Sequence, residues 1–295
     1  MTNLPFSHPT AGNRPIDPAA AAQMLTEADR VSQRAAEGID PGPLVVIRRW
    51  TPVVLFIYAV SFLLVFSDQG SASAPNPLLP GAKYANLLII PLLMQIQLVQ
   101  GARNRLPIAD ISMSRGRTIL QLLTVVPFIA ILAVSLFGVK IPWWVCILVA
   151  VGVAAPSLRE VGTRAHKSSG YTRGQRTPSP VLSSTARATS FVLGIYLGAA
   201  SAVMVFPWFP LAALPMLILL LVSVCFANKR WGLTSVGSEW QARHWVAFGI
   251  SFVLFFAFVL LVVKTSWNTP LVGILGGAAI ALPLVISAAT SRSKP

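Results

Sequence analysis

The sequence predicts an all-α, polytopic integral membrane protein with about eight transmembrane helices. Apolar residues make up 55% of the 295 residues and charged residues only 11%, whereas a water-soluble protein carries about a quarter of its residues as Asp, Glu, Lys or Arg. The apolar residues gather in runs of about 16 to 20, the length of a helix that crosses a bilayer core. Basic residues are dense in every second connecting segment, as expected when the chain crosses a membrane repeatedly.

Residues 1–49 precede the first apolar run and are expected to form a cytoplasmic N-terminal segment. They lack the apolar core of a cleavable signal peptide. A short amphipathic helix is predicted at about 18–37, because Asp17 suits its N-cap and Gly38 its C-terminal end. Its thin, Ala-rich apolar stripe could rest on the membrane surface, on the protein's own loops or on a partner. Docking on the protein itself is the expected outcome.

Eight spans follow in two groups of four. The first four form a membrane repeat at 50–157 and the last four form a second repeat at 188–289. Between them, residues 158–187 are basic and rich in Gly, Ser, Thr and Pro, which predicts a flexible cytoplasmic linker. Residues 290–295 form a cytoplasmic tail. The spans are placed near 50–67, 84–100, 118–138, 142–157, 188–206, 210–227, 245–263 and 270–289.

Internal similarity predicts that the two groups are a tandem 4+4 repeat. When the chain is shifted by 124 positions, 15 of 75 positions match without a gap between 84–158 and 208–282. Composition alone would give roughly a tenth. A unit with an even number of helices inserts in the same orientation each time, so the copies would be parallel and related by an axis along the membrane normal.

The distribution of basic residues predicts the orientation. Of the 23 Lys and Arg residues, 20 lie on one side of the proposed spans, and only Lys83, Lys140 and Lys264 lie on the other. Lys and Arg collect in cytoplasmic loops, which puts both termini in the cytoplasm. The excess of Arg over Lys, 17 to 6, is typical of a GC-rich bacterial genome. We therefore expect a bacterial cytoplasmic membrane protein.

The net charge of +14 is explained by these basic loops, with no nucleic-acid partner. The lipid bilayer is the first expected partner. Anionic lipid headgroups are candidate ligands of the basic cytoplasmic loops, with about 1 kcal/mol for each Lys or Arg near the surface. The tryptophans fit this arrangement, because an indole ring prefers the headgroup layer. Six of them lie at predicted span ends: Trp50, Trp143, Trp144, Trp208, Trp245 and Trp267.

The sequence offers little catalytic chemistry. All nine acidic residues lie outside the predicted spans, and Asp68 is the only one on the exported side. The histidines His8, His166 and His244 fall in separate segments without metal-ligand spacing. No phosphate-binding loop or nucleophile motif is present. We therefore expect no enzymatic activity, no cofactor and no metal.

Neutral polar groups and prolines inside the spans give the candidate site. Its members are Pro91, Gln95 and Gln97 in the second span, Gln121 in the third and Pro215 in the sixth. Gln97 and Gln121 could join two helices by a hydrogen bond or could line a neutral polar pathway. Pro91 and Pro215 occupy equivalent places in the two repeats; such kinks either mark a substrate site or only shape packing.

Small residues at regular spacing predict where helices pack closely. Glycines at a spacing of four, Gly194 with Gly198 and Gly273 with Gly277, predict close helix packing, either internal or between subunits.

The polar segment between the sixth and seventh spans resembles a loop of SdpI-like bacterial membrane proteins. The matching positions are Gly232, Leu233, Ser238, Trp240 and His244. Thr234 stands where that family has Arg, and Ser238 is closer to Trp240 than in the family pattern. The resemblance covers about 17 residues and implies an immunity or signalling role.

Two functions are compatible with these patterns. The first is a permease-like protein that handles a lipid or small solute, favoured by the repeat and the matched prolines. The alternative is a non-catalytic membrane partner, such as an immunity, sensing or complex-stabilising subunit, with a protein partner or a homo-oligomer. The alternative is favoured by the absence of charge inside the spans.

Overall fold

The computed structural model describes residues 23–27, 30, 42–67, 82–105, 126–134, 139, 141–165, 182–226, 229 and 231–291. These residues are almost entirely helical and include no β-strand. The chain divides into two compact units, Met1–Ile39 and Asp40–Pro295. All the long helices belong to the second unit.

In the first unit, residues 23–27 are helical. Glu27 and Arg30 approach to 3.6 Å, one turn apart. Met24 and Leu25 are each 70% exposed. The described part of the predicted amphipathic helix therefore leaves these two apolar side chains uncovered, and the rest of that helix lies outside the described residues.

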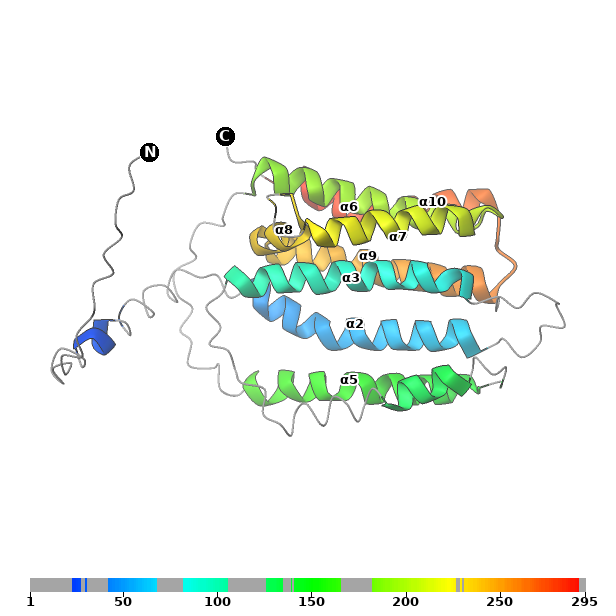
Figure 1. Cartoon of the computed structure of the whole chain (residues 1–295), viewed down its shortest axis with the longest axis horizontal. Coiled ribbons are helices and arrows are strands. Elements are labelled where there is room, and N and C mark those ends of the chain that lie inside the picture. Colours follow the sequence, from blue (N-terminus) through cyan, green and yellow to red (C-terminus); the bar gives the residue numbers. More distant parts are fainter. Residues whose placement is uncertain are drawn as a thin grey trace, which may run out of the picture. The chain divides into compact units, whose positions relative to one another are not determined.

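The second unit is a bundle of long helices with one short helix, α8, at one end (Figure 1). A further helical stretch covers residues 126–134. The labelled helices are α2 (Gly42–Ser67), α3 (Ala82–Arg105), α5 (Trp143–Ala165), α6 (Ser184–Val203), α7 (Phe209–Cys225), α8 (Leu233–Glu239), α9 (Ala242–Lys264) and α10 (Pro270–Ala289).

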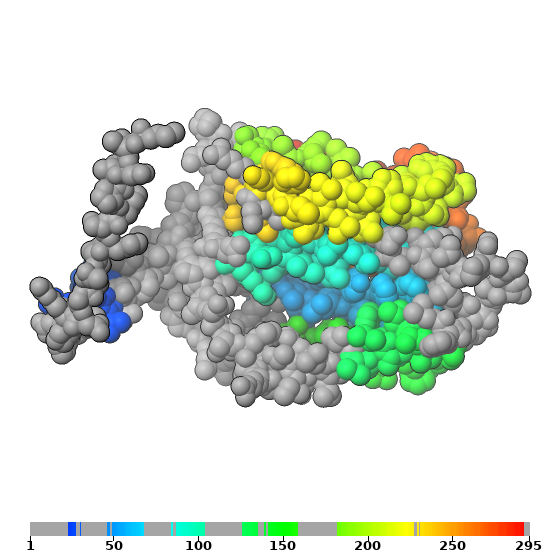
Figure 2. Space-filling view, viewed as in Figure 1, coloured from blue at the N-terminus to red at the C-terminus, as the bar shows by residue number. Residues whose placement is uncertain are grey.

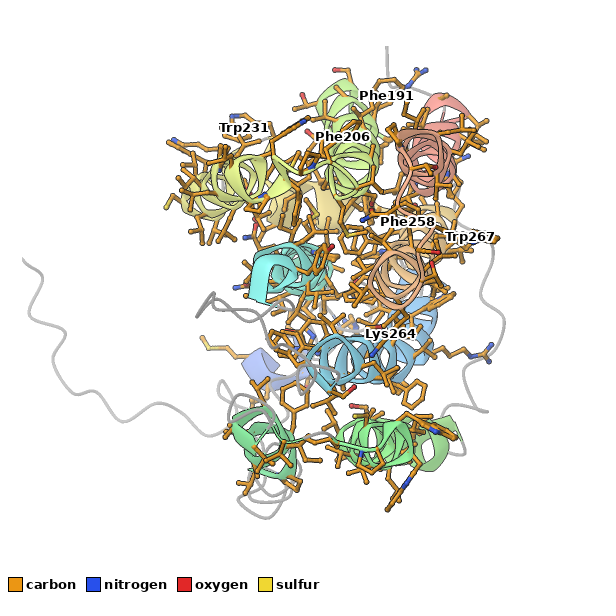
Figure 3. All side chains as sticks on the ribbon, turned by 90° about the vertical axis from the view of Figure 1, so that its right-hand side faces the viewer. Phe191, Phe206, Trp231, Phe258, Lys264 and Trp267 are labelled. Atoms are coloured by element: carbon orange, nitrogen blue, oxygen red, sulfur yellow. The ribbon has the colours of Figure 1, made fainter. Side chains whose placement is uncertain are left out.

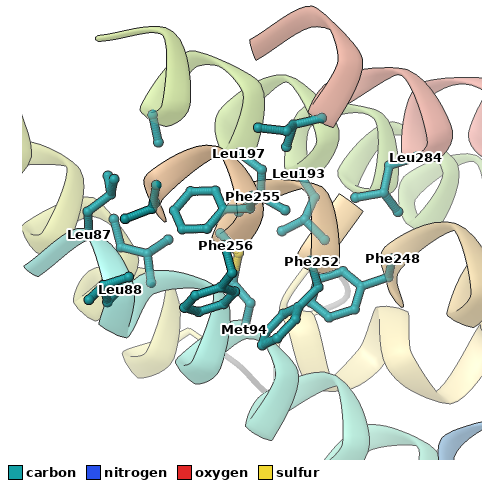
Figure 4. Close-up of a cluster of buried hydrophobic side chains, with 14 of the residues drawn as sticks. Leu87, Leu88, Met94, Leu193, Leu197, Phe248, Phe252, Phe255, Phe256 and Leu284 are labelled. Carbon is teal, nitrogen blue, oxygen red and sulfur yellow. The ribbon is translucent and has the colours of Figure 1, made fainter. Parts of the chain in front are cut away.

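Helix α9 lies in the interior of this bundle. Helices α6, α10, α9, α2 and α5 pack in that order as a row, and α3 and α7 lie along one side of it (Figure 3). Four phenylalanines of α9, Phe248, Phe252, Phe255 and Phe256, are almost completely buried at the centre (Figure 4). Their many dispersion contacts hold α9 between its neighbours, a source of stability that persists in lipid.

The outer surfaces of the bundle are apolar. Exposed Leu, Ile, Val and Trp side chains cover α5, α7 and α10 in particular, and α7 forms much of the face seen in Figure 2. Four helices are long and apolar enough to cross a membrane: Arg49–Ser67, Ser184–Val203, Ala242–Lys264 and Pro270–Ala289. Three shorter apolar helices accompany them: Leu87–Arg103, Trp143–Leu158 and Phe209–Cys225. Such exposed apolar surface requires lipid or protein cover, and the long apolar helices are compatible with a membrane protein.

The predicted glycine contacts are internal. Helices α6 and α10 form the most extensive helix pair among the described elements. A Cβ added at Gly198 would lie 2.5 Å from the carbonyl oxygen of Gly277, and one at Gly277 would lie 2.5 Å from the carbonyl oxygen of Gly198. Only glycine allows these two backbones to approach so closely.

The helix ends differ from the predicted span ends. Helix α2 begins at Gly42, eight residues before position 50, and α5 continues eight residues beyond 157 to Ala165. Helix α6 begins at Ser184, inside the predicted linker at 158–187, whose middle lies outside the described residues. Hydropathy marks only the part of a helix that suits hydrocarbon, whereas backbone hydrogen bonds continue into the polar flanks. Of the span predicted at 118–138, only the stretch at 126–134 lies among the described residues.

Candidate functional site

Three of the five predicted site residues lie on α3. Pro91 stands inside this helix and has no N–H, so the carbonyl of Leu87 loses its helical donor. Pro91 is buried, and Gln95 and Gln97 are only 7% and 6% exposed. Gln95 lies one turn after Pro91 on the same face of α3. Gln97 is turned away from Gln95 by about 200°, so the two amides face different neighbours.

Among the described side chains of α3, only the buried amide of Gln97 lacks a hydrogen-bond partner for both of its polar atoms. Its Oε1 and Nε2 are both buried, and neither has a hydrogen-bond partner among the described residues. A buried group without a partner costs about 1–3 kcal/mol. The cost can be offset by a bound molecule that supplies the missing donor and acceptor.

The two remaining predicted residues do not join this group in the described structure. Pro215 is exposed on α7, whereas Pro91 is buried on α3. The two prolines therefore occupy different surroundings despite their equivalent places in the sequence. Gln121, and with it the predicted hydrogen bond to Gln97, lies outside the described residues.

Helix α9 supplies two polar groups that sequence reasoning missed. Trp245 is 3% exposed, and its Nε1 has no partner among the described residues. Its predicted role as a headgroup anchor is wrong, because the ring packs edge-on against Trp240 with centroids 5.2 Å apart. The Oγ of Ser251 is also buried and unpartnered in the described structure.

Ser251 differs from other buried serines in the same bundle. Ser190, Ser201 and Ser291 each donate to the carbonyl four residues earlier, at 2.6–2.8 Å. A serine in a helix usually satisfies itself in this way. The hydroxyl of Ser251 makes no such bond in the described structure and is free to bind another group.

Gln97 belongs to α3, whereas Trp245 and Ser251 belong to α9. Helix α3 packs mainly on α8, and also on α2 and α7. Met94, one turn before Gln97, lies beside Phe252 and Phe256 of α9 (Figure 4). Gly101, one turn after Gln97, packs so closely on α8 that an added Cβ would overlap the carbonyl of Thr234. Gln97 thus lies between the α9 contact and the α8 contact. We call the region where α3, α8 and α9 meet the α3–α8–α9 junction.

The structure places helix α8 in a segment for which the sequence suggested only a polar loop. At Gly237 an added Cβ would overlap the carbonyl of Leu98, which complements the close approach at Gly101. Both glycines are buried. The two backbones therefore fit together without intervening side chains, and α8 lies against the last two turns of α3.

Next to the junction, a second polar cluster is held by hydrogen bonds between α8 and α6. Trp240 Nε1 donates to Ser190 Oγ at 2.8 Å, and the Ser183 N–H donates to the Glu239 carboxylate at 2.9 Å. Both bonds tie the end of α8 to the first turns of α6. Because the Trp240 indole and the Ser183 N–H already have partners, these hydrogen bonds hold the two helices together.

His244 continues that cluster toward α10. The Gln241 N–H donates to Nδ1 of His244 at 3.2 Å, which makes Nδ1 an acceptor. Nε2 then carries the proton and donates to Ser291 Oγ at 2.8 Å. The Ser291 hydroxyl donates in turn to the carbonyl of Ser287 at 2.6 Å. His244 therefore fixes the start of α9 to the end of α10.

The charges in the described part of the bundle lie outside its middle. Arg49, Arg103, Arg243 and Lys229 are exposed near the end that carries α8, and Lys264 lies at the opposite end of α9. Among the described residues, no three His, Cys, Asp or Glu side chains are grouped so that they could hold a metal. The polar chemistry available within the bundle is therefore neutral hydrogen bonding.

Comparison of the chain with protein-family models, curated proteins and solved structures finds no match.

Proposed function

We propose that this protein is a permease-like, non-enzymatic membrane protein that handles a lipid or a small neutral solute. The proposal is supported by the amide of Gln97 on α3, which is buried in the bundle and has no hydrogen-bond partner among the described residues. A polar side chain inside a membrane raises the free energy of the protein, and such side chains occur mostly where they bind or conduct a ligand.

The neutrality of the surroundings supports a neutral ligand. Proton- and ion-coupled carriers usually hold a buried Asp, Glu or His at the coupling site. The buried His244 is already committed to Gln241 and Ser291. The buried amide of Gln97 supplies a hydrogen-bond donor and acceptor without charge.

The test is native mass spectrometry of the protein released gently from its own membrane. We expect a bound non-protein mass in the wild type that is lost in Gln97→Leu. Gln100→Leu is the matched control, because Gln100 is an exposed glutamine one turn further along the same helix. A mass retained equally in all three proteins, or absent from all three, would refute the proposal.

We further propose a bacterial cytoplasmic membrane location with eight spans, cytoplasmic termini and two parallel four-helix repeats. The helix pairing supports the repeat. Helix α2, the first predicted span, packs on α5, the fourth; in the same way α6, the fifth, packs on α10, the eighth. The exposed basic residues Arg49, Arg103 and Arg243 lie at the end with α8, which supports contact of that end with anionic lipid headgroups.

The alternative function, a non-catalytic partner protein, is favoured by one observation. Met24 and Leu25 are 70% exposed on the helical part of the first unit, where a partner could cover them. Deletion of residues 1–39 should then remove a second polypeptide from the purified complex while the bundle stays folded. A truncated protein that retains every companion of the full chain would argue against this alternative.

A further inference from the structure

Glu239, the last residue of α8, is the one acidic residue of the second unit whose side chain the structure describes. It is half-buried, and its carboxylate accepts a hydrogen bond from the Ser183 N–H at 2.9 Å. The ion pair found among the described residues joins Arg30 and Glu27 in the first unit. In a protein with a net charge of +14, the carboxylate of Glu239 is therefore held by the backbone at the start of α6, and not by a described Lys or Arg.

The first turn of α6 has no negative charge of its own. The N-terminus of a helix carries a partial positive charge, because its first N–H groups have no partner within the helix. Helix α6 begins at Ser184 and has no acidic residue in its first turn. The Ser183 hydroxyl accepts from the Ala186 N–H at 3.1 Å, while Glu239 accepts from the Ser183 N–H. Helix α8 thus supplies the negative charge that the sequence of α6 lacks.

Two contacts fix the direction of α8 on α6. Glu239 binds at Ser183, and the Trp240 indole donates to Ser190 Oγ at 2.8 Å. Ser183 and Ser190 are seven residues apart, which is about 10 Å along α6. A helix held at one point can turn about that point, whereas two separated points hold its direction. Without the Glu239 bond, α8 would keep the buried Trp240 as an anchor but would lose the second point.

Helix α8 also lies directly against α3, beside Gln97. An added Cβ at Gly237 would overlap the carbonyl of Leu98, the residue that follows Gln97. One at Gly101, a turn after Gln97 on nearly the same face of α3, would overlap the carbonyl of Thr234. Helix α8 therefore connects the first turn of α6 with the part of α3 that carries the unpartnered amide.

We propose that Glu239 is a positioning residue of the Gln97 site and that α8 is the cover of this site. The bond between the Glu239 carboxylate and the first turn of α6 keeps α8 against α3. When this bond breaks, α8 leaves α3 and the Gln97 amide becomes accessible. A helix of seven residues is not stable by itself, so α8 depends on these tertiary contacts. This inference rests on the proposed function, because it adds a means of control to the same site.

The test measures how fast a water-soluble maleimide labels buried cysteines in the full-length protein in detergent micelles. Val236→Cys places a thiol at a fully buried position of α8. Cys146, fully buried on α5, is the internal reference for opening of the whole bundle. Cys225 is replaced by serine because it is exposed. A second protein carries Gln97→Cys in place of Val236→Cys, and peptide mass spectrometry reports each position separately.

Glu239→Gln keeps the shape of the side chain and removes its charge. We expect it to raise the labelling rate at both introduced cysteines about tenfold, because loss of one charged hydrogen bond shifts a local opening equilibrium by about that factor. The rate at Cys146 should not change. Unchanged rates at both introduced cysteines would overturn the inference. So would an equal increase at Cys146, which would mean that Glu239 only stabilises the bundle as a whole, or an increase at Val236→Cys alone, which would mean that α8 moves without covering Gln97.

A matched control separates the attachment of α8 from the charge at the start of α6. Ser184 is exposed in the first turn of α6, so Ser184→Asp restores a negative charge there without attaching α8. In the double variant with Glu239→Gln, labelling at both introduced cysteines should stay fast. A return to the rate seen with Glu239 intact would assign the effect to the charge of α6 and overturn the role of Glu239 in holding α8.

Labelling requires no bound molecule, so the two proposals can fail separately. If Glu239→Gln exposes Gln97 as expected but a native bound mass is retained in Gln97→Leu, the cover stands and the handling function is refuted. If that mass is lost in Gln97→Leu while Glu239→Gln leaves labelling unchanged, the handling function stands and the cover is refuted.

Discussion

The close contact of α6 with α10 can be tested with one added methyl group. In Gly198→Ala the new Cβ would lie 2.5 Å from the carbonyl oxygen of Gly277 and 2.8 Å from the Cβ of Ala281. Ordinary contact begins at 3.4 Å, so the helices must separate locally by 3.4 − 2.5, or about 0.9 Å. Neither neighbouring atom can rotate away, because one is backbone and the other is fixed to it.

The expected cost follows from that displacement. A radial gap of about 0.5–1 Å forfeits a quarter to a half of the contact energy of the atoms it separates, and overpacking of this kind costs about 1–3 kcal/mol. Alanine is favoured over glycine inside a helix by about 0.5–1 kcal/mol. We therefore expect Gly198→Ala to lower the free energy of unfolding by roughly 1–2 kcal/mol.

The matched control is Gly152→Ala on α5, where an added Cβ meets nothing within 4 Å. This variant should gain up to about 1 kcal/mol from helix propensity alone. Both free energies can be measured by reversible unfolding in mixed micelles with increasing dodecyl sulfate, followed by circular dichroism. If Gly198→Ala proves as stable as Gly152→Ala, the backbones of α6 and α10 are not in contact and the reasoning is refuted.

Two further predictions concern buried side chains. Ser190→Ala removes the acceptor of the Trp240 indole and should cost about 1–3 kcal/mol. The double variant with Trp240→Phe should lose less stability than the sum of the two single losses, and strictly additive losses would contradict the bond. An apolar maleimide should label the exposed Cys225 and spare the buried Cys146 in the folded protein, as mass spectrometry of single-cysteine variants would show; equal labelling would contradict the burial of Cys146.

Much of the bundle could be predicted because apolar runs report directly on contact with hydrocarbon. Four of the expected spans are long, apolar helices in the structure, and three more are shorter apolar helices. The glycine spacing predicted a close contact, and the structure gives its partners. Helix α8 could not be predicted, because its seven residues include Thr, Ser and Gly, which are poor helix formers. It forms where Gly101 and Gly237 let two backbones meet, and that contact depends on the tertiary fold.

The site was predictable only in part. Hydropathy singled out Gln97 as a polar residue in an apolar run, and its burial fits that interpretation. The sequence could not show that Trp245 and Ser251 carry buried polar atoms without partners, because the faces of α9 that are covered depend on how the helices pack. The equivalence of Pro91 and Pro215 also did not predict their different burial. Sequence similarity between two segments does not report which side of each helix is covered.

The packing of α8 on α3 also bears on whether the two halves of the chain need a covalent link to stay together. Helices α2 and α3 come from before the linker, yet they pack on α9 and α8, which come from after it. The two parts of the chain are thus joined by side-chain and backbone contacts, independently of the peptide bonds between them. We expect residues 1–165 and 182–295, produced from two separate genes, to assemble into one complex that co-purifies. Substitution of Gly237 by leucine should weaken that assembly. The covalent linker would then set the local concentration of the two fragments, while the α3–α8 and α2–α9 contacts specify how they fit.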